Sequence, residues 1–190
     1  VENANLEVYK AAQRLAAGRM GTTLTAAFVR GDTLYLAHVG DSRAYLIREK
    51  RAICLTVDHT AVSEMVRSKL LSADKIRTHA QRSVLTKAIG LALFIQPDIT
   101  QHRLEEDDCL ILCSDGIWSV IEDDEFAKLA VGTPVDRISH NLVDLALQRG
   151  TDDNASVVVF RLSKLVPVPA QPPEHKKGGW FQNLRKLMHE

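Results

Sequence analysis

The sequence of 190 residues has no surplus of positive charge and few aromatic side chains. Basic and acidic residues number 24 each, and aromatic residues make up 5% of the chain. Nucleic-acid-binding domains depend on a basic surface or on aromatic side chains that stack on bases, so we expect no nucleic-acid partner. No run approaches the roughly 18 apolar residues of a membrane span, and residues 1–18 lack the apolar core of a signal peptide. These absences predict a cytoplasmic, single-domain protein.

Cysteine is also scarce, and its three positions do not form a metal-binding or redox motif. Cys54, Cys109 and Cys113 all lie within apolar runs, and none belongs to a CxxC pair. Free cysteine commonly packs as a small hydrophobic side chain. We therefore expect three buried cysteines, and neither a zinc site nor a thiol nucleophile.

Short alternating apolar runs dominate residues 22–56 and are typical of β-strands. Strands are expected at residues 23–29, 33–39, 43–49 and 52–56. The polar joins at 30–32 and 49–51 are typical of antiparallel hairpins. The join at residues 40–43 differs, because it places a carboxylate at a tight turn between two apolar strands.

The remainder of the chain alternates less regularly between helical and strand patterns. Helices are expected over residues 2–17, from 58 to about 70, from 122 onward, and from 133 to 150, where Thr133-Pro134 is typical of a helix start. Further strands are expected at 98–104, 109–116 and 155–162. Because strands cluster and helices cluster without βαβ alternation, the predicted class is α+β with antiparallel sheet.

Three aspartates occupy the ends of apolar runs or the loops beside them: Asp41, Asp115 and Asp153. Taken singly, each is also a common turn residue, since Asp-Gly and Asp-Asn favour turns. Together they favour a shared role. Carboxylate oxygens at strand ends suit hard divalent ions such as magnesium or manganese, so the three could converge on a metal.

Six ordered blocks resemble the metal-dependent PP2C-like serine/threonine protein phosphatases of bacterial type. The blocks are GTTLTAAFV, LAHVGDSRAYL, LTVDHT, SVLTKAIG, LILCSDGIWSVI and RGTDDNASVVVF, from about Gly18 to Leu162. The resemblance implies an antiparallel β-sandwich flanked by helices on both faces, with a two-metal centre at one end. We accordingly expect a phosphatase domain at residues 1–162.

The resemblance also implies roles for individual residues. Asp115 and Asp153 match carboxylates that bind the second metal, and Asp41 matches a residue that helps to hold a third, weaker ion. His59 matches a position near the site that we interpret as supporting or structural. Residues 66–82 correspond to a mobile flap that contributes to substrate choice.

Such a site would use two or three Mn²⁺ or Mg²⁺ ions to hydrolyse phosphoserine and phosphothreonine in proteins. A phosphomonoester dianion needs charge neutralisation and an activated water, and two metal ions about 4 Å apart supply both. In that scheme the aspartates hold ions and are not nucleophiles.

The family pattern also includes an N-terminal part that these residues lack. No DGxGG loop occurs in the sequence, and its aspartate would bridge both metals. We therefore expect an N-terminally incomplete fold with exposed strand edges, weak metal binding and little or no turnover by this chain alone. Two explanations stay open: a fragment of an active phosphatase, which the start at Val1 within a helix favours, or a degenerate interaction module without catalytic activity.

The C-terminal residues form a separate unit in the sequence. Residues 163–179 are a proline-rich linker, and residues 180–190 carry an apolar stripe at helical spacing beside basic side chains. This short amphipathic tail could contact a membrane surface. Alternatively, it docks on its own domain or is disordered.

Overall fold

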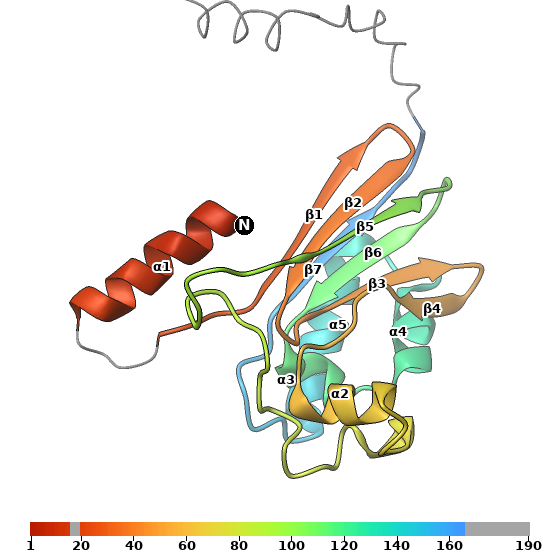
Figure 1. The fold of residues 1–190 in the computed structure, drawn as a ribbon. Helices are drawn as coiled ribbons and strands as arrows, with labels where there is room; N and C mark the ends of the chain where they lie inside the picture. Colours follow the sequence, from red (N-terminus) through yellow and green to blue (C-terminus); the bar gives the residue numbers. More distant parts are fainter. Residues whose placement is uncertain (16–19, 166–190) are drawn as a thin grey trace, which may run out of the picture.

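The computed structural model describes residues 1–15 and 20–165, and their architecture is α+β (Figure 1). The elements in chain order are α1 (Glu2–Arg14), β1 (Leu24–Arg30), β2 (Thr33–Val39), β3 (Arg43–Arg48), β4 (Arg51–Cys54), α2 (Ala61–Arg67), the 3-10 turn η1 (Ala73–Lys75), β5 (Asp98–Arg103), β6 (Cys109–Cys113), α3 (Asp115–Trp118), α4 (Asp123–Ala130), α5 (Val135–Gln148) and β7 (Val157–Arg161). The predicted class, two antiparallel sheets flanked by helices, is confirmed.

The strands form two antiparallel sheets that pack face to face. The three-stranded sheet has the order β1-β2-β5, and the four-stranded sheet has the order β4-β3-β6-β7. Alternation along β2 and β3 turns one set of apolar side chains toward the space between the sheets. The buried members of this inter-sheet cluster are Leu34, Leu36, Ala44, Leu46, Leu104, Leu110 and Leu162.

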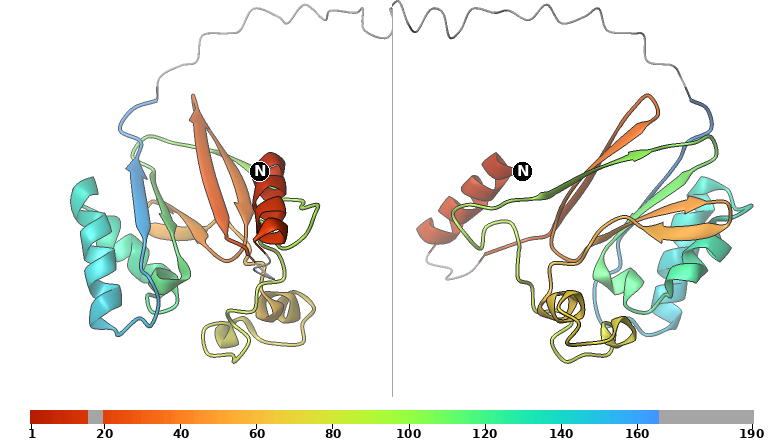
Figure 2. Two further views of the ribbon diagram at one scale, coloured as in Figure 1. Left: turned by 90° about the vertical axis from the view of Figure 1, so that its left-hand side faces the viewer. Right: turned by 45° about the vertical axis from the view of Figure 1, so that its right-hand side comes forward.

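Helices lie on both sides of the two sheets but cover them unequally (Figure 2). On one side α5 packs against β7, and α4 packs against β4 and β3. This helix-covered layer buries Tyr45, Trp118 and Phe126 completely or nearly so. On the other side, α1 is joined to the loop before β5 through Asn5, whose amide donates to Ala92 O at 3.0 Å.

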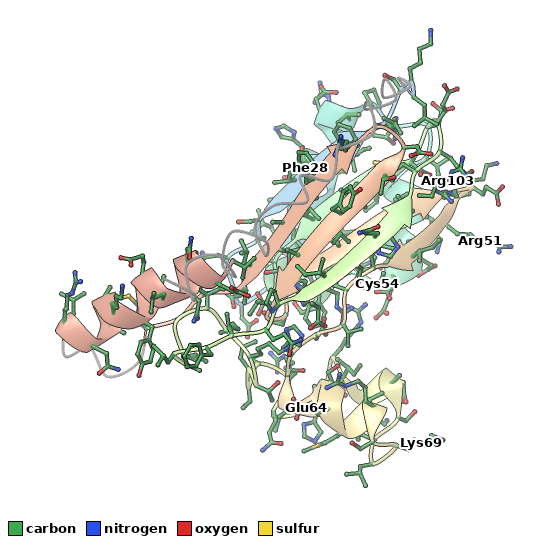
Figure 3. All side chains as sticks on the ribbon, turned by 45° about the horizontal axis from the view of Figure 1, so that its top comes forward. Phe28, Arg51, Cys54, Glu64, Lys69 and Arg103 are labelled. Atoms are coloured by element: carbon green, nitrogen blue, oxygen red, sulfur yellow. The ribbon has the colours of Figure 1, made fainter. Side chains whose placement is uncertain are left out.

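The outer face of the three-stranded sheet is exposed. Phe28 and Ile99 have exposed fractions of 64% and 61%, and Phe28 contacts the ring of Tyr35 on this face (Figure 3). The edge strand β7 also leaves Val158 and Phe160 exposed at 64% and 43%. The described residues thus include the exposed apolar edges that the sequence predicts.

Several element boundaries differ from the sequence-based prediction for local reasons. Helix α2 begins only after Thr60, because the Thr60 side chain accepts a hydrogen bond from Ser63 N and caps the helix there. The run at 109–116 does not remain a strand to its end, since the chain turns into α3 at Asp115. The prediction of three buried cysteines is wrong for Cys54, which is half-buried on the short edge strand β4.

Candidate metal centre

Asp115 lies just beyond the end of β6, a strand with four buried residues. Strand β6 is central in its sheet, and after Ser114 the chain turns directly into the one-turn helix α3, of which Asp115 is the first residue. Its carboxylate is half-buried and accepts a hydrogen bond from Gly116 N at 3.0 Å. The carboxylate is therefore presented by a rigid strand-to-helix junction.

The loop that carries Asp153 is tied to this junction through Ser114. The Ser114 hydroxyl donates to Asn154 O at 3.0 Å and accepts from Ser156 N at 3.0 Å. The backbone N–H of Ser114 donates to Ser156 O at 3.0 Å, and the Thr151 hydroxyl donates to Gly116 O at 2.8 Å. These bonds bring the loop at 151–156 against α3.

Gly116 permits this close approach. A Cβ atom at this position would lie 2.5 Å from Asn154 O and 2.9 Å from its carbonyl carbon. Such contacts are with backbone atoms, which cannot move aside as the end of a side chain can. A side chain at residue 116 would therefore push the Asp153 loop away from Asp115.

Asp115 and Asp153 line one small pocket of about 110 Å³. Its other lining residues are Arg82, Ser83, Ser119 and Asp152. Burial raises the pKa of Asp115 above its ordinary value, and the negative charge of Asp153 raises it further. A divalent cation would offset this repulsion between carboxylates.

Asp41 approaches the same region from the turn between β2 and β3. Its exposed fraction is 7%. Burial raises the pKa of Asp41 to about 6, and the charges of Asp115 and Asp58 add to the rise. Asp41 does not line the pocket of Asp115 and Asp153, but it interacts electrostatically with Asp115.

The donor chemistry of these residues fits a hard divalent ion, although the ligand set they provide is small. Over residues 1–15 and 20–165, no group of three or more His, Cys, Asp or Glu side chains is arranged to hold a metal ion. Asp115 and Asp153 share a pocket, and Asp41 stands beside them. Water or phosphate oxygens would complete the coordination of an ion held by these carboxylates, as is usual for Mg²⁺.

His59 lies behind the Asp41 turn, away from the pocket. Its Nδ1 accepts a hydrogen bond from Gly40 N at 3.0 Å, so the ring proton is assigned to Nε2, which lies 3.1 Å from Asp98 Oδ2. Burial lowers the pKa of His59, which favours this neutral form. The structure therefore places His59 as a support of the turn.

Sequence reasoning did not identify a buried ion pair beside the site. Arg43 donates to both carboxylate oxygens of Asp58, at 2.9 and 2.7 Å, and its guanidinium lies 3.7 Å from the ring centroid of Trp118. An arginine within an apolar strand, two residues after Asp41, was the available signal. Asp152, the neighbour of Asp153 in the chain, also lines the pocket, and its Oδ2 lies 3.7 Å from Arg82 Nη2.

The region corresponding to the expected flap packs beside a second, larger cavity. Residues 66–82 contain the end of α2 and the turn η1, and Arg77 pairs with Asp123 at 2.8 Å. The cavity of about 640 Å³ lies between η1 and the start of α4. It does not include Asp41, Asp115 or Asp153, so size alone does not mark the candidate metal centre.

Comparison with known proteins identifies the class to which this fold belongs. The family described as "Protein phosphatase 2C" matches residues 2–155. A putative protein phosphatase 2C-type from Streptococcus pyogenes serotype M6 is 33% identical over 162 residues, 84% of this chain and 65% of that protein. The chain therefore belongs to the protein phosphatase 2C family.

Two solved structures agree with this assignment. The serine/threonine phosphatase of S. agalactiae has a TM-score of 0.80 at 33% identity, covering 86% of this chain and 67% of that one. The catalytic domain of the serine/threonine protein phosphatase PstP, in complex with two manganese ions, has a TM-score of 0.74 at 28% identity, covering 83% and 66%. The chain thus spans about two thirds of the length of these phosphatase chains.

Proposed function

We propose that this chain is part of a metal-dependent serine/threonine protein phosphatase in which Asp115, Asp153 and Asp41 hold Mn²⁺ or Mg²⁺. The observation that carries the proposal is the convergence of Asp115 and Asp153 on one pocket, where burial and like charge raise the pKa of Asp115. The manganese ions bound by the PstP relative support the choice of metal.

Bound divalent ions would supply positive charge against a phosphate dianion and would lower the pKa of a water molecule. The protein's own contribution is to hold the ligands in place. Ser114 and Gly116 fix the Asp153 loop against α3, which presents Asp115. Arg82 contributes a positive charge to the pocket lining.

The proposed substrates are proteins phosphorylated on serine or threonine. Support comes from the relatives, which are described as serine/threonine phosphatases. The acidic pocket, with three aspartates and one arginine in its lining, would repel a phosphate group unless metal ions were bound. The proposed hydrolysis of phosphoesters therefore requires bound metal ions.

Manganese-dependent hydrolysis of a small aryl phosphate tests the proposal directly. Because the DGxGG aspartate is absent from these residues, we expect weak activity, which rises with Mn²⁺ and is lost in Asp115→Asn and in Asp153→Asn. The rival function, a phosphatase-like interaction module, predicts no activity in any of the three proteins. Activity unaffected by both substitutions would refute the site assignment.

Localisation and the tail remain predictions. Residues 180–190 lie outside the described residues, as does most of the linker at 163–179. Among the residues that the structure describes, no helix is long and apolar enough to cross a membrane. Membrane contact by the tail is tested by liposome co-sedimentation of the full chain against a chain ending at Leu162, and equal partitioning would contradict it.

A further inference from the structure

Trp118 connects helix α3, which carries Asp115, to the turn between β2 and β3, which carries Asp41. It lies on α3, three residues after Asp115, and its exposed fraction is 2%. Its indole Nε1–H donates to the backbone carbonyl of Asp41 at 2.8 Å. One short helix thus presents Asp115 and also binds the turn that presents Asp41.

The indole ring is fixed in place by the neighbouring ion pair. The Arg43 guanidinium lies 3.7 Å from the ring centroid, within the range of a cation–π contact. Asp58 binds that guanidinium with both oxygens, and the Tyr45 hydroxyl accepts from Arg43 Nη1 at 3.0 Å. Because these partners are buried, the ring has little freedom to rotate away from Asp41.

The turn that bears Asp41 is held from its other side by His59. Gly40 adopts φ +110°, a region that favours glycine, and its N–H donates to His59 Nδ1 at 3.0 Å. The backbone N–H of His59 in turn donates to the backbone carbonyl of Gly40 at 2.7 Å. Both backbone groups of Gly40 are therefore hydrogen-bonded to His59. The backbone carbonyl of Asp41 is hydrogen-bonded to the indole of Trp118.

We propose that Trp118 is a positioning residue whose indole N–H sets the place of Asp41 relative to Asp115. This rests on the proposed function, in which both carboxylates serve divalent ions. Loss of the N–H would leave a buried carbonyl without that partner, and the peptide after Asp41 would reorient toward another donor. The ion held by Asp41 would then be bound less tightly, although the core around the ring would stay packed.

A double-mutant cycle in the full chain separates positioning from packing. The probe is Mn²⁺ alone, titrated while free Mn²⁺ is measured by electron paramagnetic resonance. Trp118→Phe keeps an aromatic ring and removes the N–H donor, and we expect it to weaken Mn²⁺ binding about tenfold, the change for one buried hydrogen bond. Asp41→Asn should also weaken binding, and Trp118→Phe should cause no further loss in the Asp41→Asn protein.

The contradicting results are distinct. If Asp41→Asn weakens binding but Trp118→Phe does not, the positioning role of Trp118 is wrong and the metal role of Asp41 stands. If both variants weaken binding and their effects add fully, Trp118 does not act through Asp41. If Asp41→Asn changes nothing, Asp41 holds no ion and both the inference and that part of the proposed function fail.

A second substitution covers the case in which phenylalanine does not preserve the fold. Benzothienylalanine at position 118 keeps the size and shape of the indole and replaces only the N–H by sulfur. We expect the same roughly tenfold weakening, in a protein that still melts cooperatively with a melting temperature lowered by only a few degrees. Unchanged Mn²⁺ affinity in a protein that folds normally would overturn the proposal.

Discussion

The two sheets of this protein are built from similar strands but differ in what lies on their outer faces. The four-stranded sheet is covered by α3, α4 and α5, whose apolar side chains form a continuous core with it. The three-stranded sheet leaves Phe28 and Ile99 exposed. Asp115 follows β6, and Asp153 precedes β7; both strands belong to the covered sheet. Rigid presentation of the carboxylates therefore coincides with the best-packed layer.

The largest expected effect is loss of packing in the helix-covered layer. Phe126 on α4 is fully buried and stacks on Tyr45 with ring centroids 4.3 Å apart. Phe126→Ala should lower the free energy of unfolding by about 3–5 kcal/mol, as large-to-small core substitutions do. Urea denaturation measures this. A loss below about 1 kcal/mol would show that this layer is not the main stabilising core.

The next effect is expected at Gly116, where the layer meets the Asp153 loop. Gly116→Ala should lower the free energy of unfolding by about 2 kcal/mol, because the new Cβ overlaps backbone atoms. Gly132→Ala is the matched control, since Gly132 has nothing within 4 Å and only its φ of +72° opposes a side chain. Chemical denaturation of both variants measures the difference. Equal losses would mean that the close approach at Gly116 has no energetic consequence.

Asp41 lies in the turn that connects β2 of one sheet to β3 of the other, and its substitution should have a pH-dependent effect on stability. Its pKa is raised from 3.8 to about 6, so its contribution to stability is present below pH 3.8 and lost as the pH rises through about 6. Asp41→Asn removes the ionisable carboxyl group, so the variant does not lose this stability as the pH rises. In metal-free buffer it should stabilise the protein by up to about 2 kcal/mol at pH 8 relative to its effect at pH 4. Thermal melts of both proteins at the two pH values measure this, and a difference independent of pH would contradict it.

The smallest effect is expected on the exposed sheet. Phe28 has an exposed fraction of 64%, so Phe28→Ala should change the free energy of unfolding by less than about 1 kcal/mol. The same urea experiment as for Phe126 applies, which makes the pair a direct comparison of the two faces. A loss as large as that of Phe126→Ala would show that the outer face of the three-stranded sheet is covered in solution.

The sequence predicted the strands well because their alternation is a local property. The run at 33–39 alternates with a period of two, and β2 forms there with alternate residues buried. The run at 43–49 is continuously apolar over residues 44–47, as expected for a strand buried on both faces, and β3 forms there. Thr133-Pro134 likewise marked the start of α5. These features depend on neighbouring residues and can be read from them.

Features that depend on distant residues were not predictable in this way. The need for glycine at position 116 comes from the close approach of Asn154, 38 residues later in the chain. The Arg43–Asp58 pair and the bond from Trp118 to Asp41 also join segments far apart in sequence. Single aspartates could be proposed from the sequence, but their spacing and supports required the fold.

Mn²⁺ binding to the full chain tests the central claim, that Asp115 is a ligand in a metal centre, most directly. Asp136→Asn is the matched control, because Asp136 is an aspartate of α5 with a side chain 77% exposed. In calorimetric titrations, we predict that the unaltered protein and Asp136→Asn bind Mn²⁺ equally, while Asp115→Asn binds at least about tenfold more weakly, as expected when a charged ligand is lost. Equal Mn²⁺ affinity of Asp115→Asn and the unaltered protein would contradict the account.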